Sequence, residues 1–88
     1  MNLETLIEEG EKVKASNTKQ SSRGGSYISG EEYEKWIAKS IIFLEDNEEE
    51  FSSFLIEKFK RASEQAVGNS VRHYNTMIGI LKALHETE

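Results

Sequence analysis

The segment from Tyr27 to Trp36 constrains the fold most strongly, because a polar, glycine-bearing stretch ends there and an amphipathic helix begins. Ser29 and Glu32 have the spacing of a capping box, in which each side chain accepts a hydrogen bond from the other residue's backbone amide. Ile28 and Tyr33 lie just outside this pair, at the spacing of a hydrophobic staple. We therefore expect a helix that starts at this junction, with these four side chains fixing where it begins.

Four segments of the chain are amphipathic with a helical period. They are predicted as helices over residues 3–14, 30–45, 48–66 and 70–85, since apolar residues recur in each at three- and four-residue spacing. The chain has no proline, and no segment alternates apolar with polar residues over several positions, so strands are not expected. The sequence therefore predicts one all-α domain, residues 1–88, folded as a small four-helix bundle whose last three helices pack as antiparallel neighbours.

Polar residues and glycines mark further features of these helices. Asn2 and Asn47 are expected as the N-caps of the first and third helices. Gly68 is expected in the left-handed conformation that ends the third. A glycine inside a helix costs up to ~1 kcal/mol relative to alanine. We therefore expect another helix to approach closely at Gly10 and at Gly79, where the small residue would be compensated by packing.

Residues 15–28 are predicted to form a long flexible loop, because they are mostly small and polar and include Gly24-Gly25. A connection of this length inside a small domain is either functional or disordered. We expect disorder here, although Arg23 beside Gly24-Gly25 could form a small anion-binding nest of low specificity.

Length and composition limit the class of protein. With 88 residues the chain can build one small core. It has no cysteine, so disulfides and thiolate chemistry are excluded. No apolar run reaches the roughly 18–20 residues that span a membrane. The acidic N-terminal segment lacks the layout of a signal peptide. We expect a cytoplasmic protein without a membrane-embedded part.

The net charge of −5 is unevenly distributed. Residues 29–50 hold eight acidic and two basic side chains, whereas residues 51–88 hold four acidic and five basic ones. A candidate basic patch is expected where the third and fourth helices meet, made by Lys58, Lys60, Arg61 and Arg72. Such a patch indicates a nucleic-acid-associated small regulator as the alternative function. We do not favour nucleic acid as the partner, because the chain as a whole is acidic.

No catalytic, metal-binding or cofactor-binding residue is predicted. His73 and His85 are expected on one helix, rotated about 120° from each other and about 18 Å apart along its axis, so they cannot share a metal ion. The glutamates at 48–50 match a helix start, where the helix dipole favours negative charge. The glycines do not form a phosphate-binding motif. We therefore expect a protein that is not an enzyme and needs no cofactor.

The apolar residues exceed what the core of such a small domain can bury. Those of the third helix are expected on its buried face, namely Phe51, Phe54, Leu55 and Phe59. The helix over 30–45 carries apolar residues all round near its end, which leaves Ile42 and Phe43 as candidates for an exposed patch with Ile80. We predict a protein-protein interaction or oligomerisation module, such as a homodimer. The alternative is that a neighbouring helix covers the patch.

Three segments together resemble a known module. They are Tyr27–Trp36, Phe43-Leu44, and the stretch from Gly68-Asn69 through Tyr74 to Leu84. They are similar to a helical N-terminal domain of uncharacterised bacterial proteins, often followed by a TIR-like or other effector domain. The resemblance implies a bacterial or phage origin and brings no catalytic residue with it. Because the chain ends at Glu88 without an effector domain, we expect either a free-standing small protein or a fragment of a longer one.

Overall fold

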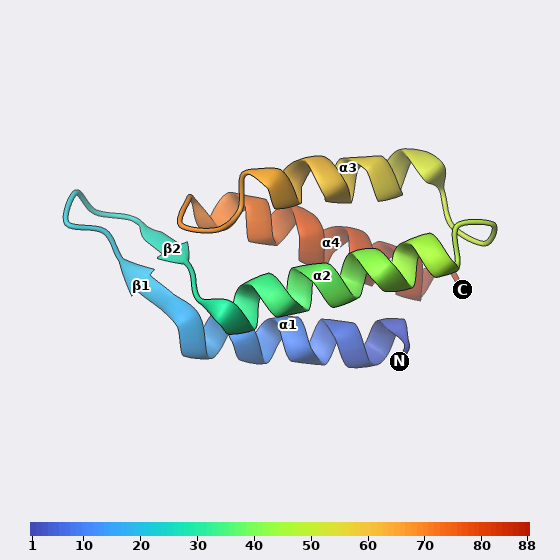
Figure 1. Ribbon diagram of the computed structural model, residues 1–88, viewed down its shortest axis with the longest axis horizontal. Helices are drawn as coiled ribbons and strands as arrows, with labels where there is room; N and C mark the ends of the chain where they lie inside the picture. Colours follow the sequence, from blue (N-terminus) through green and yellow to red (C-terminus); the bar gives the residue numbers. More distant parts are fainter.

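Four helices lie side by side along the long axis of the molecule, and a two-stranded hairpin closes one end, as the computed structural model of residues 1–88 shows (Figure 1). The elements in chain order are α1 (Leu3–Asn17), β1 (Thr18–Gln20), β2 (Ser26–Ile28), α2 (Glu31–Asp46), α3 (Ser53–Glu64) and α4 (Val71–Glu86). Each helix runs antiparallel to the next along the chain, and α1 also packs against α4. The predicted small helical bundle is confirmed, with a short sheet added to it.

The core runs through the centre of the bundle and is aromatic in its middle part. The Trp36 ring stacks on Tyr33 with centroids 6.1 Å apart and lies 5.7 Å from the Tyr74 ring. Phe59 of α3 approaches the same indole at 6.4 Å. These rings come from α2, α3 and α4. The aromatic cluster therefore joins α3 to both of its neighbours and also joins α2 to α4, which lie diagonally across the bundle.

Helices α2 and α4 both approach α1 closely at Gly10. A Cβ atom placed on Gly10 would lie 2.6 Å from Cζ2 of Trp36 and 2.9 Å from Cδ1 of Ile78. The close approach predicted at Gly10 is therefore confirmed. The same prediction for Gly79 is wrong, because Gly79 is exposed and a Cβ atom there would meet nothing within 4 Å.

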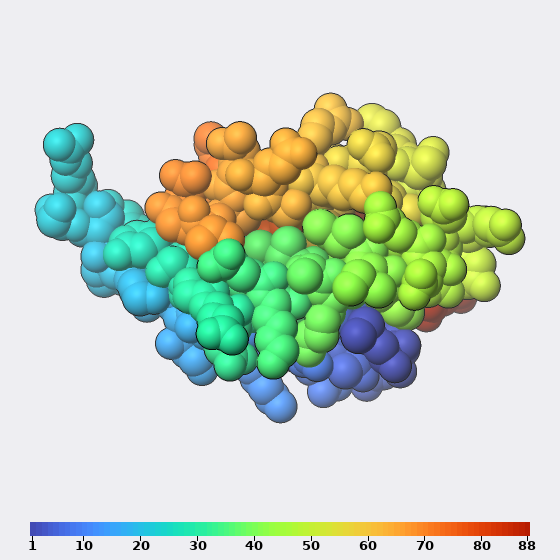
Figure 2. All heavy atoms as spheres, viewed as in Figure 1, coloured from blue at the N-terminus to red at the C-terminus, as the bar shows by residue number.

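The predicted flexible loop over residues 15–28 is wrong. Helix α1 continues to Asn17, and the chain then folds back on itself as the β1–β2 hairpin. The antiparallel register pairs Thr18 with Ile28, Lys19 with Tyr27, and Gln20 with Ser26. Gly24 and Gly25 reverse the chain at the tip, with φ of 87° and 81°, a region that favours glycine. Figure 2 shows this tip projecting beyond the helical body.

The base of the hairpin is held against the turn between α3 and α4. The backbone amide of Gly68 donates to the carbonyl oxygen of Ile28 at 2.9 Å, and Tyr27 forms an antiparallel bridge with Ser70. Ile28 is only 1% exposed, so the hairpin contributes to the core. Gly68 has the predicted positive φ, 77°, although α3 itself already ends at Glu64.

The start of α2 differs from the predicted capping box. Gly30 is the N-cap, with φ of 119° and no side-chain cap, so the capping role predicted for Ser29 is wrong. The Ser29 hydroxyl instead accepts a hydrogen bond from Nζ of Lys19, at 2.9 Å across the hairpin. Ile28 and Tyr33, the predicted staple, are both buried. The hairpin explains the change, because the backbone amide of Ser29 donates to the carbonyl oxygen of Asn17 at 3.3 Å and so extends the pairing one residue beyond β2.

Helix α3 starts five residues later than predicted, at Ser53. Its N-cap is Ser52, whose hydroxyl accepts from the amide of Leu55 at 3.3 Å. Asn47, the predicted N-cap, instead donates its side-chain amide to the carbonyl oxygen of Phe43 at 2.9 Å and so closes the end of α2. The predicted cap of α1 is confirmed, since Asn2 accepts from the amide of Thr5 at 2.8 Å.

No helix combines the length and apolarity that crossing a membrane requires.

Candidate partner-binding surface

The three residues predicted to form an exposed apolar patch do not lie together. Ile42 is 57% exposed on the outer face of α2. Phe43 is half-buried, and its ring packs against Phe51 with centroids 6.0 Å apart. Ile80 is only 6% exposed and belongs to the core, so its predicted place on the surface is wrong. The reason is the position of α4 between α1 and α3, which buries a wide face of this helix.

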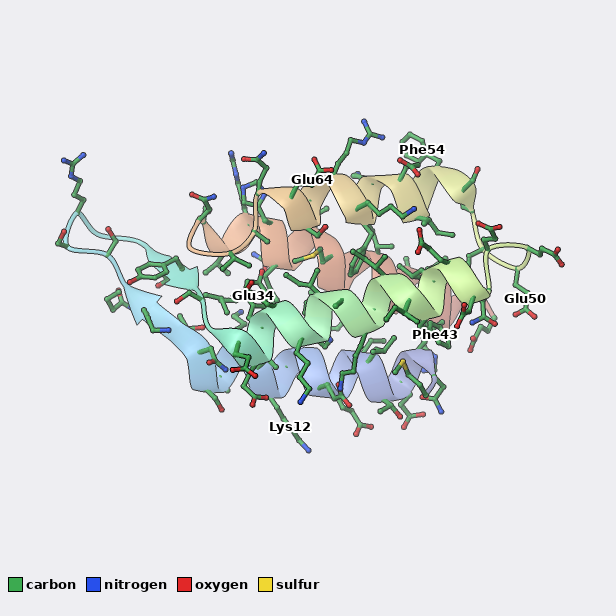
Figure 3. All side chains as sticks on the ribbon, viewed as in Figure 1. Lys12, Glu34, Phe43, Glu50, Phe54 and Glu64 are labelled. Carbon is green, nitrogen blue, oxygen red and sulfur yellow. The ribbon has the colours of Figure 1, made fainter.

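The most exposed aromatic side chain is Phe54, a residue predicted to be buried. It is 65% exposed and projects away from the bundle in Figure 3, whereas Phe43 lies along the side of α2. The core positions of α3 are Ile56 and Phe59. Since Phe54 is two residues from Ile56, it lies on the opposite side of the helix.

A shallow hollow of about 360 Å³ adjoins Phe54 between α3 and α4. It is lined by Phe54, Lys58, Arg61, Ala62, Gln65, His73 and Thr76. The hollow thus combines an aromatic ring with two cationic side chains and has no carboxylate in its lining. Lys58 and Arg61 are both exposed, and neither forms an ion pair within the chain.

The structure divides the predicted basic patch. Lys58 and Arg61 lie together in this hollow, joined by His73 of α4. Lys60 points to α2 instead, where its Nζ lies 2.6 Å from a carboxylate oxygen of Glu45. The hydrogen bond with Glu45 raises the pKa of Lys60 above its usual value. Arg72 is exposed but is not among the residues that line the hollow.

A second hollow, of about 440 Å³, lies at the other end of these helices, where α3 begins and α4 ends. It is lined by Glu50, Phe51, Ser52, Leu55, Leu84, Thr87 and Glu88. His73, Thr76 and Leu84 of α4 and its C-cap Thr87 recur at helical spacing and lie on one side of the helix. Both hollows therefore lie along one line between α3 and α4, which we call the α3–α4 seam. The seam is basic at its Arg61 end and acidic at its Glu50 end.

Two tyrosines with shifted pKa values lie in the core near α1. Burial is the main cause that raises the pKa of Tyr74 to about 12, and the carboxylate of Glu11 adds to it. Burial raises the pKa of Tyr33 further, and the neighbouring Tyr74 contributes. Nζ of Lys14 lies 5.5 Å above the centre of the Tyr74 ring, a cation–π arrangement. These phenols belong to the packing of the bundle and do not line the α3–α4 seam.

Comparison of the chain with protein-family models, with curated proteins and with solved structures gives no match. The resemblance to the helical N-terminal domain of bacterial proteins stays a prediction.

The histidines and carboxylates do not gather into a metal site, since no group of three or more His, Cys, Asp or Glu side chains is placed to hold an ion. His73 lines the basic hollow of the seam. His85 lies toward the far end of α4, where its Nδ1 is 3.5 Å from a carboxylate oxygen of Glu88.

Sequence reasoning missed the exposure of Phe54 and its place in one hollow with His73. The signal available for Phe54 was its spacing to its neighbours, because Phe54, Lys58, Arg61 and Gln65 recur at i, i+4, i+7 and i+11. Residues at this spacing share one face of a helix, and three of the four are polar. A lone aromatic on an otherwise polar face is the pattern of an exposed side chain.

Proposed function

We propose that this chain is a non-enzymatic protein-interaction module that binds a partner protein through the α3–α4 seam, with Phe54 as its anchor. The observation that carries the proposal is the exposure of Phe54, at 65%, beside the unpaired cations Lys58 and Arg61. Burying a phenylalanine side chain yields roughly 1.5–3 kcal/mol, so a partner that covers Phe54 gains this free energy.

The composition of the seam supports a protein partner. Aromatic residues and arginine are enriched at the energetic centres of protein interfaces, where surrounding polar residues exclude water. Phe54 and Arg61 lie on one face of α3, and the hollow between the helices can receive a side chain of the partner. This arrangement provides an anchor, a depression and a charged rim within one short helix.

The alternative, a nucleic-acid-associated regulator, draws on the same two cations. Lys58 and Arg61 beside an aromatic ring could contact a phosphate and a base. Affinity for nucleic acid depends on neutralising several phosphates, however, and the pairing of Lys60 with Glu45 leaves few free cations on this face. Carboxylates at the other end of the seam would repel a continuous phosphate backbone.

The proposal is tested by photo-crosslinking in the native host cells. A photoreactive phenylalanine analogue replaces Phe54, and the control places the same analogue at Ala38, which is exposed on the outer face of α2. We expect a discrete protein adduct from position 54, lost when Arg61→Glu is added, and none from position 38. A nuclease-sensitive adduct would support the alternative, and the absence of any adduct at position 54 would refute the proposal.

A further inference from the structure

The α3–α4 seam carries opposite charges at its two ends. At one end, Lys58 and Arg61 line a hollow without carboxylates. At the other end, Glu50 lines the second hollow just before α3 begins. Phe54 and Leu55 lie between these ends, so the most exposed apolar side chain of the seam is near its middle.

A surface with this polarity is complementary to itself. In a two-fold symmetric contact, residue i of one copy meets residue j of the other, and each pair occurs twice. When a second copy lies antiparallel across the seam, its acidic end meets the basic end of the first copy. We propose that the partner of the α3–α4 seam is a second copy of this chain, bound antiparallel in a homodimer. This inference rests on the proposed function and names its partner.

The spacing along α3 gives the expected register. With the two-fold axis between Leu55 and Ile56, Glu50, in the turn before α3, lies opposite Arg61 of the other copy. The same axis leaves Phe54 one residue from the position opposite Lys58 of the second copy. The long lysine side chain spans this offset, and its ammonium group is attracted to a ring within about 6 Å. A helix rises about 1.5 Å per residue, so Phe54 and Arg61 are only about 10 Å apart along the axis. The Glu50–Arg61 and Phe54–Lys58 contacts therefore belong to a single interface between the two α3 helices.

The centre of this contact is apolar and its edges are charged. Phe54 and the half-buried Leu55 of both copies meet near the axis, where they lose contact with water. The charge pairs surround them and exclude water, which is the usual anatomy of an interface. An isolated acidic peptide would satisfy Lys58 and Arg61 but would leave Glu50 facing a like charge or solvent. A second copy satisfies both ends of the seam.

The expected affinity follows from the size of the seam. Stable dimers bury about 800 Å² on each partner. The molecule is 43 Å long and 21 Å across, with a total accessible surface of 5498 Å². The seam runs along the long axis, so it is long enough for an interface of that size. Its width is only that of two helices, which limits the area that a second copy can cover. We therefore expect a reversible dimer with a dissociation constant on the order of micromolar or weaker.

Charge reversal at Arg61 and Glu50 tests this register by sedimentation equilibrium between 10 µM and 1 mM protein, roughly the range around the expected dissociation constant. We expect R61E and E50R each to weaken dimerisation about tenfold or more, because each places like charges opposite one another twice. An equimolar mixture of R61E and E50R should regain a dimer of wild-type affinity, since each charge then faces its opposite. Lys35→Glu on the outer face of α2 is the matched control and should dimerise like the wild type.

The mixture makes the test independent of folding defects, because two misfolded variants would not restore one another. A wild-type chain that stays monomeric at 1 mM, about the upper limit of the expected range, would overturn the homodimer. So would an R61E variant with wild-type affinity, or a mixture that remains monomeric. If the chain is monomeric while position 54 crosslinks to another protein, only the choice of partner is wrong. If it is monomeric and position 54 gives no adduct, the proposed function also fails.

Discussion

The indole of Trp36 lies directly on the backbone of Gly10, and its Nε1 donates a hydrogen bond of 2.8 Å to the carbonyl oxygen of Leu6, one turn earlier in α1. The absence of a side chain at Gly10 lets the ring reach this carbonyl. One glycine and one tryptophan thereby set the distance between α1 and α2 and orient the ring on which Tyr33 and Tyr74 pack.

Gly10→Ala is expected to destabilise the fold. The new Cβ atom would lie within 3 Å of two indole carbons and of Cδ1 of Ile78, so the core would have to move apart. Overpacking of this kind costs about 1–3 kcal/mol, which outweighs the gain in helix propensity of up to ~1 kcal/mol. Chemical denaturation of both chains measures the difference in the free energy of unfolding.

Gly79→Ala is the matched control for that prediction. It is the same substitution within a helix, but nothing lies within 4 Å of the new Cβ atom. We expect it to stabilise the fold by about 0.5–1 kcal/mol, since only the propensity term remains. If both variants shift the stability in the same direction, the packing of Trp36 against Gly10 does not limit the α1–α2 distance.

Ser40→Ala is expected to raise the free energy of unfolding by about 1 kcal/mol. Ser40 of α2 is fully buried, and its hydroxyl has no hydrogen-bond partner. A buried polar group without a partner costs about 1–3 kcal/mol, and alanine also has the higher helix propensity. The control is Ser63→Ala, because the hydroxyl of Ser63 donates to the carbonyl oxygen of Lys60 at 2.6 Å. Thermal denaturation should show stabilisation for Ser40→Ala and not for Ser63→Ala.

The helices were predictable because their burial follows a helical period. The buried residues of α1, α2 and α4 span about two to three turns of each helix, so tertiary packing agrees with the local pattern. The hairpin lacks such a signal. Thr18, Lys19 and Gln20 are all exposed, and each strand has only three residues, too short to show alternation. The hairpin is held by its own strand pairs and by contacts of Tyr27 and Ile28 with the distant α3–α4 turn, which a local pattern does not show.

The surface residues were predictable only where helical geometry decides the side on which they lie. Lys58 and Arg61 are three residues apart and share a face, whereas Lys60 is rotated about 200° from Lys58 and reaches α2. The exposure of Phe54 could not be read from hydrophobicity, because Ile56 competes for the buried side of a helix of 12 residues. Helix α3 starts later than predicted because Ser52 caps it, whereas the side chain of Asn47, the predicted cap, closes the end of α2.

Ile28→Ala is expected to destabilise the protein by about 2–5 kcal/mol, the range for a large side chain removed from a core. Ile28 belongs to β2 and is buried, although it falls within the segment predicted as a loop. The control is Ile42→Ala on the exposed face of α2, expected to change stability by less than about 0.5 kcal/mol. Equal and small effects in urea denaturation would mean that the hairpin does not pack on the bundle.

Stability is expected to fall as the pH rises above 10, because of Tyr33 and Tyr74. Burial raises the pKa of both phenols, that of Tyr74 to about 12, whereas tyrosine in an unfolded chain titrates near 10. Between pH 10 and 12 the unfolded state therefore loses protons that the folded state retains, and unfolding becomes more favourable. The full contribution is present below pH 10, and the loss is at most about 1.4 kcal/mol per pH unit for each tyrosine.

The double variant Tyr33→Phe/Tyr74→Phe isolates the contribution of these two phenols. We expect its free energy of unfolding to fall less steeply between pH 10 and 12 than that of the wild type, because the phenylalanines carry no proton to lose. The control is Tyr27→Phe, which removes the hydroxyl of a half-buried tyrosine of the hairpin outside the core. Urea denaturation at several pH values measures the slopes. If the free energy of unfolding falls equally steeply for the wild type and the double variant, Tyr33 and Tyr74 lose their protons at the same pH in the folded and the unfolded state.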